Sequence, residues 1–388
     1  MAPLRVALVA GESSGDQLGF KLMRALRAAT NGRIEFFGVG GEAMAADGMK
    51  SFFPMSEIAV MGILPVLAKL PSLLARIRQT ADAIIEGSPD ALVIIDSPDF
   101  THRVARRVRA ALPRLPVVDY GSPTVWAWRP GRAKAMRGYV DCVLALLPFE
   151  PAAHERLGGP RCVYVGHPLI ERLDELRPNA EEAARRAAWP PRIVVLPGSR
   201  RAETARLMED FGAALTLVSR NVGAIEAVLP TLPHVEAEVR ARAVAWSVRP
   251  RIVVGEAEKL AAFRGARAAL AKSGTGTLEL ALAGVPMVGA YKVARRDAWL
   301  KYFVNVSTIL LPNLILGERA IPELLQRDCT PAALAGALAP LMGDGPERAA
   351  QVEALARLDG LMRLPDDEQP SGRAALEVFE TIERRRVC

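Results

Sequence analysis

The feature that most constrains the fold is a regular alternation of short, almost wholly apolar segments with longer amphipathic ones. Between the apolar runs, segments such as Gln17–Ala29 and Thr277–Ala283 have the pattern of helices. Strands without polar alternation are typical of parallel sheets that helices cover on both faces. The pattern therefore predicts an α/β protein with doubly wound, Rossmann-like sheets. The clearest predicted strands are Arg5–Val9, Ala91–Ile95, Val117–Tyr120, Cys142–Leu146, Arg192–Leu196, Arg251–Val254 and Ala268–Ala271.

A charged, alanine-rich stretch interrupts the alternation near the middle of the chain. Residues 171–191 close with Trp189-Pro190-Pro191, and a new strand then begins a second series of strands and helices. A chain of 388 residues seldom builds a single core. We therefore expect an N-terminal domain (1–170), a linker (171–191) and a C-terminal domain (192–360). A last helical segment, residues 361–388, is expected to pack back onto the N-terminal domain.

Charge and cysteine content narrow the classes of function. The net charge of +7 favours anionic ligands. Aromatic residues make up only 5% and are not interleaved with basic ones, so nucleic acid is not an expected partner. The 4 cysteines are scattered without a C-x-x-C pair, which argues against a disulfide framework or zinc site and for a cytoplasmic protein. No signal peptide or membrane-spanning stretch is expected.

Acidic side chains follow the first predicted strand. The turn holds Gly11, Glu12, Ser14 and Asp16, and its glycine spacing matches neither G-x-G-x-x-G nor the P-loop. Ligands of open α/β sheets bind at the carboxyl ends of the strands. Because carboxylates repel phosphate, this turn indicates contact with sugar hydroxyls. A capped turn without a ligand is the alternative interpretation.

A second acidic loop follows Ala91–Ile95. Asp96 and Asp99 emerge there, where a carboxylate can act as a general base. One alternative is that Asp99 only caps the next helix. Another is that His102 is the base, although a lone histidine next to Arg103 is more often a surface residue.

Two more segments each have more than one possible role. Trp126 and Trp128 lie among turn residues, where they stack on a sugar, line an acyl groove or fill a gap under the loop. His167 precedes Pro168 and is therefore extended, so it is a hinge residue as readily as a ligand.

The second half of the chain contains two loops suited to an anion. Gly198 and Ser199 follow a strand and precede Arg200, whose guanidinium can contact two phosphate oxygens. A later loop opens a helix whose first amides can bind a diphosphate, and Glu279 one turn on is placed for ribose hydroxyls. Ordinary helix capping is the alternative for each loop. The sequence has no Asp-x-Asp pair for Mg²⁺, so we expect no metal and no cofactor. The residues of the later loop are Ser273, Gly274, Thr275 and Thr277.

Residues 60–78 are unusually apolar for a surface helix. Apolar side chains form one face at helical spacing, and Lys69, Arg76 and Arg78 lie beside it. This combination suits a helix on an anionic membrane surface, and a buried core helix is the alternative. The predicted membrane contacts are Met61, Leu64, Leu67, Leu70 and Leu74.

Together these motifs resemble one family, lipid-A-disaccharide synthase, a bacterial glycosyltransferase. The similar segments occur in family order over about residues 5–330. They are residues 10–16, 60–62, 95–100, 122–129, 147–150, 166–169, 196–200, 273–279, 312–315 and 322–326.

The resemblance implies a GT-B fold, with two Rossmann-like domains facing a cleft. It implies transfer of 2,3-diacylglucosamine from UDP to the 6-hydroxyl of 2,3-diacylglucosamine 1-phosphate, with inversion to a β(1→6) linkage. It also implies a homodimer that exchanges C-terminal segments, and attachment to the inner face of the inner membrane. One base suffices for an inverting transfer, and no covalent partner is needed.

The resemblance also implies roles for single residues. Asp99 is the expected base, and Glu12 and Asp16 bind sugar hydroxyls. Arg200 and Asn313 match positions needed for activity, with Arg200 on the diphosphate. The remaining expected contacts are Ser273, Gly274 and Thr275 with phosphate and Glu279 with ribose.

Two other interpretations remain open. The chain departs from the family pattern at Ile170-Glu171 and near Glu181–Pro191. Another GT-B enzyme, such as a UDP-N-acetylglucosamine epimerase or an undecaprenyl-linked glycosyltransferase, shares the second-half loops but does not need residues 60–78 or Asp99. A non-catalytic membrane-bound UDP-sugar sensor is the third possibility.

Overall fold

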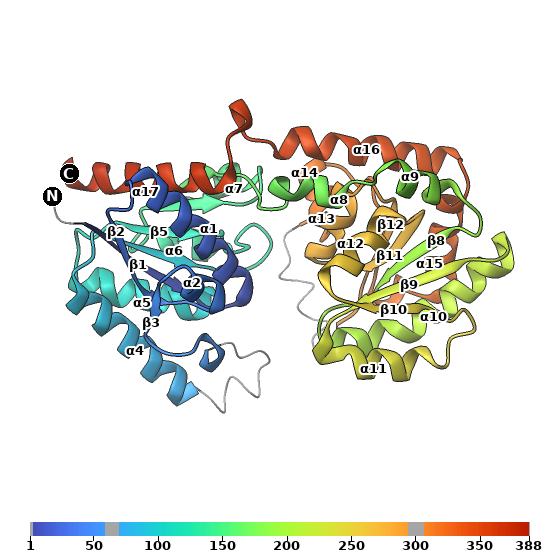
Figure 1. Cartoon of the computed structure of the whole chain (residues 1–388), viewed down its shortest axis with the longest axis horizontal. Coiled ribbons are helices and arrows are strands. Elements are labelled where there is room, and N and C mark those ends of the chain that lie inside the picture. Colours follow the sequence, from blue (N-terminus) through green and yellow to red (C-terminus); the bar gives the residue numbers. More distant parts are fainter. Residues whose placement is uncertain (1–2, 59–69, 294–305, 388) are drawn as a thin grey trace. The chain divides into compact units, whose positions relative to one another are not determined.

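The computed structural model describes residues 3–58, 70–293 and 306–387 and divides into two compact units (Figure 1). Unit 1 comprises Met1–Glu171 and Arg363–Cys388, and unit 2 comprises Arg172–Met362. Each unit contains a parallel sheet with helices on both faces, so the predicted doubly wound α/β class is confirmed. The segment expected as a linker holds helices α8 (Leu173–Leu176) and α9 (Ala180–Ala187), which belong to unit 2.

The sheet of unit 1 has seven strands in the order β3-β2-β1-β4-β5-β6-β7. Its direction of winding reverses between β1 and β4, and such a switch point leaves a crevice at the carboxyl ends of the two strands. The strands are β1 (Leu4–Ala10), β2 (Ile34–Val39), β3 (Lys50–Ser51), β4 (Ala91–Ile95), β5 (Val117–Tyr120), β6 (Cys142–Ala145) and β7 (Arg161–Tyr164).

Alternate residues of these strands supply two cores, one on each face of the sheet. Val6 and Leu8 of β1 belong to one core, whereas Ala7 and Val9 belong to the other. The period of two follows from strand geometry. The first core is covered by α1 (Ser13–Ala29) and α17 (Pro370–Val387), and the second by α4 (Leu70–Gly87) and α5 (Pro98–Ala111). Shorter helices are α2 (Glu42–Ala46), α6 (Gly131–Met136) and α7 (Glu150–Arg156).

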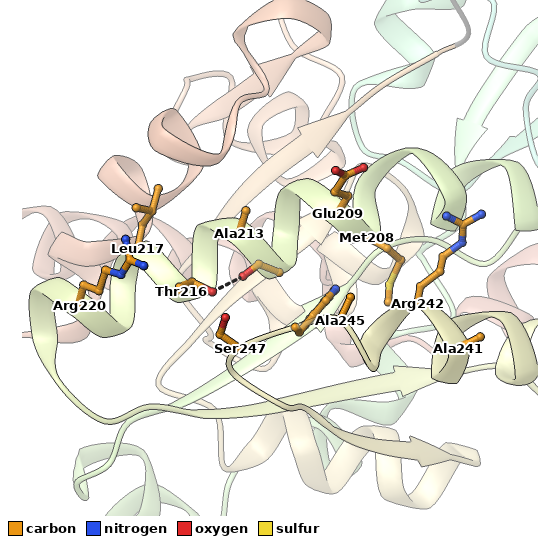
Figure 2. Close-up of a pocket in the computed structure, with 12 residues that line it drawn as sticks. Met208, Glu209, Ala213, Thr216, Leu217, Arg220, Ala241, Arg242, Ala245 and Ser247 are labelled. Atoms are coloured by element: carbon orange, nitrogen blue, oxygen red, sulfur yellow. Dashed lines mark hydrogen bonds between the residues drawn. The ribbon is translucent and has the colours of Figure 1, made fainter.

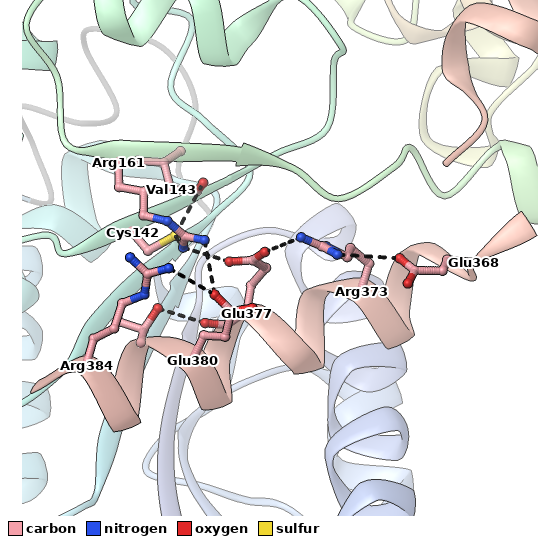
Figure 3. Close-up of polar contacts among 9 residues, drawn as sticks. Cys142, Val143, Arg161, Glu368, Arg373, Glu377, Glu380 and Arg384 are labelled. Carbon is pink, nitrogen blue, oxygen red and sulfur yellow. Dashed lines mark hydrogen bonds and ion pairs between the residues drawn. The ribbon is translucent and has the colours of Figure 1, made fainter. Parts of the chain in front are cut away.

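Helix α17 packs within unit 1 although it ends the chain. Its buried side chains recur at helical spacing and join the core that α1 also covers. They are Ala374, Ala375, Val378 and Ile382. Figure 3 shows the polar contacts beside them, where Arg161 of β7 lies 2.7 Å from the fully buried carboxylate of Glu377. Arg373 donates to the same carboxylate at 2.6 Å.

The sheet of unit 2 repeats this plan with six strands in the order β10-β9-β8-β11-β12-β13. Its switch point lies between β8 and β11. The strands are β8 (Arg192–Leu196), β9 (Glu226–Thr231), β10 (Arg251–Val254), β11 (Ala268–Lys272), β12 (Met287–Tyr291) and β13 (Glu323–Leu325). The helices are α10 (Arg201–Val222), α11 (Pro233–Ala243), α12 (Glu256–Arg264), α13 (Thr275–Leu282), α14 (Leu311–Leu316), α15 (Pro331–Leu338) and α16 (Pro346–Met362).

Candidate active site

The two acidic loops of unit 1 meet at the switch point of its sheet. Ser14 donates to Asp96 at 2.7 Å, and Ser97 donates to Glu12 at 3.4 Å. A Cβ atom on Gly11 would lie 2.3 Å from the Cβ of Ser97, so only glycine permits this approach. The structure thus brings the predicted residues Gly11, Glu12 and Ser14 together with the loop that precedes Asp99.

Asp99 lies in the first turn of α5 with its side chain 82% exposed. The N-cap of α5 is Ser97, so the interpretation of Asp99 as the cap is wrong. The carboxylate forms an ion pair with Arg132 of α6 at 3.1 Å. It is therefore accessible to a substrate hydroxyl while a cation holds it in place.

A cavity of about 230 Å³ joins these carboxylates to an apolar wall. Glu12, Ser97 and Asp99 form its polar side. The rest is mostly hydrophobic and includes the first turns of α4, so the site combines hydrogen-bonding groups with an apolar surface. The remaining lining residues are Ile58, Leu70, Leu73, Leu74, Ile77, Pro98, Phe100 and Arg103.

Helix α4 changes character along its length. Leu70 and Leu74 are each 38% exposed, whereas Ile77, Thr80 and Ala81 are buried. The core interpretation therefore holds for the later turns of the helix. The first described turn is exposed, and its contact with a membrane stays a prediction. The other predicted membrane contacts, Met61, Leu64 and Leu67, lie outside the described residues.

His102 is buried, so the expectation of a surface histidine is wrong. Its Nδ1 lies 3.0 Å from the hydroxyl of Tyr139, and its Nε2 lies 3.2 Å from the carboxylate of Asp119. The ring connects α5 to β5. It does not line the cavity that contains Asp99.

Asp16 is buried and its carboxylate already has partners. Its oxygens accept from the backbone amides of Gly41, Ala43 and Met44 at 2.8, 2.9 and 3.1 Å. These amides begin α2, where a carboxylate also stabilises the helix N-terminus. In the structure Asp16 thus positions the start of α2, and its expected contact with a sugar stays a prediction.

Trp126 fixes the loop that follows β5. Its indole N–H donates to the buried carboxylate of Glu150 at 3.1 Å, and its ring meets Phe149 edge-on. Burial raises the pKa of Glu150 to about 7. Of the interpretations of Trp126, the structure favours a hydrophobic anchor. His167 has a similar local use, because its Nδ1 accepts from the amide of Leu169 at 3.1 Å.

In unit 2, Glu203 organises the first anion-type loop. It accepts from the amide of Ser199 at 3.1 Å and contacts Lys272 at 3.0 Å and Arg200 at 3.5 Å. Gly198 has φ of 127°, and a Cβ there would lie 2.6 Å from that of Glu203. Arg200 stays 59% exposed and available to an anion. The sequence analysis missed Glu203 and Lys272, although a lysine ending a strand beside a glycine-rich turn is a usable signal.

The second loop uses some of its predicted ligands internally. Ser273 donates to the carbonyl of Ile309 at 2.8 Å, and the buried Thr277 donates to that of Gly274 at 2.7 Å. Glu279 accepts from Lys259 at 2.9 Å. The hydroxyls of Ser273 and Thr277 thus shape the loop, while Thr275 and the first amides of α13 remain for an anion.

Asn313 is fully buried and satisfied within unit 2. Its amide donates to Ile321 and Glu323, each at 2.9 Å, and accepts from the amide of Ile321 at 2.9 Å. It ties α14 to β13. In the structure Asn313 thus positions neighbouring segments, and its expected importance for activity stays a prediction.

The groove between α10 and α11 lies apart from these loops (Figure 2). Its volume is about 700 Å³, and it is lined by residues from Met208 to Arg220 of α10 and from Ala241 to Ser247. Helix α10 starts beside the carboxyl end of β8, and the groove extends along its later turns. It is consequently not the place where the sheet would bind a nucleotide.

We expect Glu203→Ala to weaken binding of a diphosphate anion by about ten-fold or more, because the loop loses the side chain that holds its anion-binding groups in place. Without Glu203, the Ser199 amide and the Lys272 ammonium lose their fixed positions. Isothermal titration with inorganic pyrophosphate measures the effect. Glu209→Ala, an exposed residue of the same helix, is the control. Equal affinities of the two variants would contradict the assignment of this loop.

A family model described as lipid-A-disaccharide synthetase matches residues 6–366. The chain belongs to this family. The resemblance read from the motifs is thereby confirmed, and the protein is a glycosyltransferase of lipid A disaccharide biosynthesis.

Relatives within the lipid-A-disaccharide synthetase family match almost end to end. Lipid-A-disaccharide synthase of Bradyrhizobium diazoefficiens is 55% identical over 383 residues, 98% of this chain and 97% of the relative. That of Nitrobacter hamburgensis is 54% identical, with 98% and 96% covered.

Solved structures show that the synthetase fold is GT-B. The glycotransferase of kitacinnamycin has a TM-score of 0.64 at 18% identity, with 98% of this chain and 99% of that chain covered. MurG of Acinetobacter baumannii has a TM-score of 0.58 at 16% identity, with 97% and 100% covered. At these identities the likeness concerns the fold alone.

Two features are absent from the synthetase within residues 3–58, 70–293 and 306–387. None of the helices there combines the length and apolar character needed to cross a bilayer. The same residues contain no cluster of three or more His, Cys, Asp or Glu side chains that could hold a metal ion.

Proposed function

We propose that this enzyme transfers 2,3-diacylglucosamine from UDP to the 6-hydroxyl of 2,3-diacylglucosamine 1-phosphate, with inversion at the anomeric carbon. The observation that carries the proposal is the cavity that Glu12 and Asp99 line together with Leu70 and Leu74. A sugar hydroxyl and an acyl chain of one molecule fit such a site.

Asp99 is the proposed general base. It removes the proton of the acceptor 6-hydroxyl as that oxygen attacks the anomeric carbon of the donor. The bond from that carbon to the diphosphate oxygen breaks, and UDP leaves with the electron pair. The new bond forms on the face opposite the leaving group, so an α-linked donor yields a β product. The exposed carboxylate beside Arg132 supports this role.

The remaining residues bind the two substrates. Glu12 orients a sugar hydroxyl beside Asp99. Arg200 and the first amides of α13 stabilise the negative charge that develops on the leaving diphosphate. Glu279 binds the ribose hydroxyls through the oxygen that Lys259 does not occupy.

The proposed location is the inner face of the inner membrane, where both acylated substrates reside. The exposed start of α4 supports this location. We also propose a homodimer formed by exchange of C-terminal segments, because the contacts of α17 with unit 1 are equally available to the helix of a second copy.

The anomeric configuration of the product tests the proposed function. Purified protein is mixed with both acylated substrates, and the disaccharide is examined by proton NMR. A β(1→6) disaccharide 1-phosphate is expected. An α linkage would contradict inversion, and absence of any disaccharide would contradict the transfer itself.

Replacing both Leu70 and Leu74 by serine should weaken binding to vesicles that contain anionic phospholipid by about ten-fold or more. Each substitution removes about 0.7 kcal/mol or more of apolar contact with the membrane, because only 38% of each side chain is exposed. Both side chains are part-exposed, so the fold is retained. Co-sedimentation measures binding, and Leu376→Ser, equally apolar and 50% exposed on α17, is the control. Undiminished binding of the double variant would contradict the membrane role of α4.

A further inference from the structure

We propose that Arg103 binds the phosphate group of the acceptor, which makes it a specificity-determining residue. The inference rests on the proposed function, since it concerns the acceptor in the cavity with Asp99. Arg103 lines that cavity from α5, together with Glu12, Asp99 and the apolar residues of α4. It adds a cation to a site whose other lining residues are two carboxylates, the Ser97 hydroxyl and apolar side chains.

Arg103 has no protein partner in the described parts of the chain, unlike Arg106 and Arg109 of the same helix. Arg107 also lacks one there, but only Arg103 lines the cavity. Arg106 lies over the ring of Tyr139, and Arg109 pairs with Asp141 at 2.5 Å. Asp99 pairs with Arg132 rather than with Arg103. Residues 59–69, which precede α4, contain no Asp or Glu in their sequence. An exposed guanidinium directed to a cavity without a carboxylate partner is suited to an anionic ligand.

The chemistry of the cavity specifies the kind of anion. A ligand of this cavity contacts the apolar wall through hydrocarbon, and it presents a hydroxyl group to Asp99, the proposed base. A phosphomonoester presents several oxygens to the planar guanidinium fork, which binds phosphate through two hydrogen bonds. The fit is therefore to an acylated sugar phosphate.

The spacing on α5 supports placing the hydroxyl and the phosphate on one sugar. Asp99 and Arg103 are four residues apart, so their Cβ atoms lie about 5–6 Å apart on one helix face. This separation is comparable to the width of a hexose ring. In the proposed acceptor, C1 carries the phosphate and C5 carries the 6-hydroxymethyl group, and both carbons are bonded to the ring oxygen. A 6-hydroxyl at Asp99 therefore leaves the phosphate on the same edge of the sugar, within reach of Arg103.

The test compares Arg103→Gln with the unaltered enzyme on two acceptors, diacylglucosamine 1-phosphate and the same sugar without phosphate. Both are presented in neutral detergent at saturating donor. We expect KM for the phosphorylated acceptor to rise about ten- to a hundred-fold, with little change for the other acceptor. Arg103→Lys should restore part of the loss. Arg107→Gln, an exposed arginine one turn further along α5 and outside the cavity, is the control and should leave both values unchanged.

Three results would overturn the inference, and each is distinguishable. Equal losses on both acceptors would show that Arg103 does not read phosphate, while the proposed function stands. Weaker binding to anionic vesicles with unchanged acceptor preference would assign Arg103 to a lipid headgroup. If the unaltered enzyme forms disaccharide from neither acceptor, the proposed function fails and this inference with it.

Discussion

Asp99→Asn should lower turnover by about 10²–10⁴-fold, the usual range for loss of a general base. Asparagine keeps the size of the side chain but does not accept the proton of the acceptor hydroxyl. The affinity for UDP should change little, because the residues assigned to UDP lie in unit 2. Steady-state release of UDP measures turnover, and titration with UDP measures affinity.

A second carboxylate of unit 1 serves as the control for the turnover of Asp99→Asn. Asp82→Asn alters an exposed aspartate of α4 outside the cavity and should leave turnover unchanged. Near-normal turnover of Asp99→Asn would exclude Asp99 as the base. A lower affinity for UDP that accounts for the whole loss would place Asp99 in donor binding.

Glu377→Ala should lower the free energy of unfolding by about 3 kcal/mol, at the lower end of the range for breaking a buried ion pair. The carboxylate is fully buried between Arg161 and Arg373, which are each about one-third exposed. After the substitution both guanidinium groups can be partly hydrated. The loss of unfolding free energy therefore stays at the lower end of that range. Denaturant unfolding followed by circular dichroism measures it.

Glu380→Ala is the matched control, since Glu380 also contacts Arg161 but its side chain is 45% exposed. An exposed ion pair contributes less than about 1 kcal/mol. Similar losses for the two variants would show that burial of Glu377 does not decide how α17 is held on unit 1.

Most strands that the sequence analysis identified are buried on both faces, as β4 is. Strand β10 was identified although only Val253 in it is buried, and the buried β12 was not identified. Strand β6 was predicted to reach Leu146 and ends at Ala145. Strands that were not predicted have weaker local signals. Strand β2 contains Gly38, where a Cβ would lie 1.9 Å from the carbonyl oxygen of Leu8, and β9 contains Pro230. Contacts with neighbouring strands, rather than the intrinsic preference of their residues, decide whether such segments form strands.

The positions of the site loops were predictable because of a general property of parallel sheets. Carboxyl ends of neighbouring strands share one edge, so loops distant in sequence meet there. The loops after β1 and β4 therefore meet in unit 1, as Ser14 and Asp96 show. The same rule brings Lys272 at the end of β11 to Glu203 in the first turn of α10, the helix that follows β8.

The use of single side chains was not predictable from the sequence. Asp16 binds amides more than twenty residues away, and Ser273 binds the carbonyl of Ile309. The side-chain oxygen of Asn313 likewise accepts a hydrogen bond from the amide of Ile321 in a neighbouring segment. Local patterns identify a polar residue in a loop, but they do not show which distant backbone group is close enough to bind it. The roles proposed for Glu12, Asp99, Arg200 and Glu279 remain predictions.

The measurement that tests the central claim most directly is UDP release in three mixtures. Purified enzyme receives the acylated UDP donor alone, the donor with diacylglucosamine 1-phosphate, or non-acylated UDP-N-acetylglucosamine alone. We predict sustained release of UDP only in the second mixture, because transfer requires an acylated acceptor in the cavity beside Asp99. Equal release from UDP-N-acetylglucosamine alone would contradict the account and indicate another UDP-sugar activity on this fold.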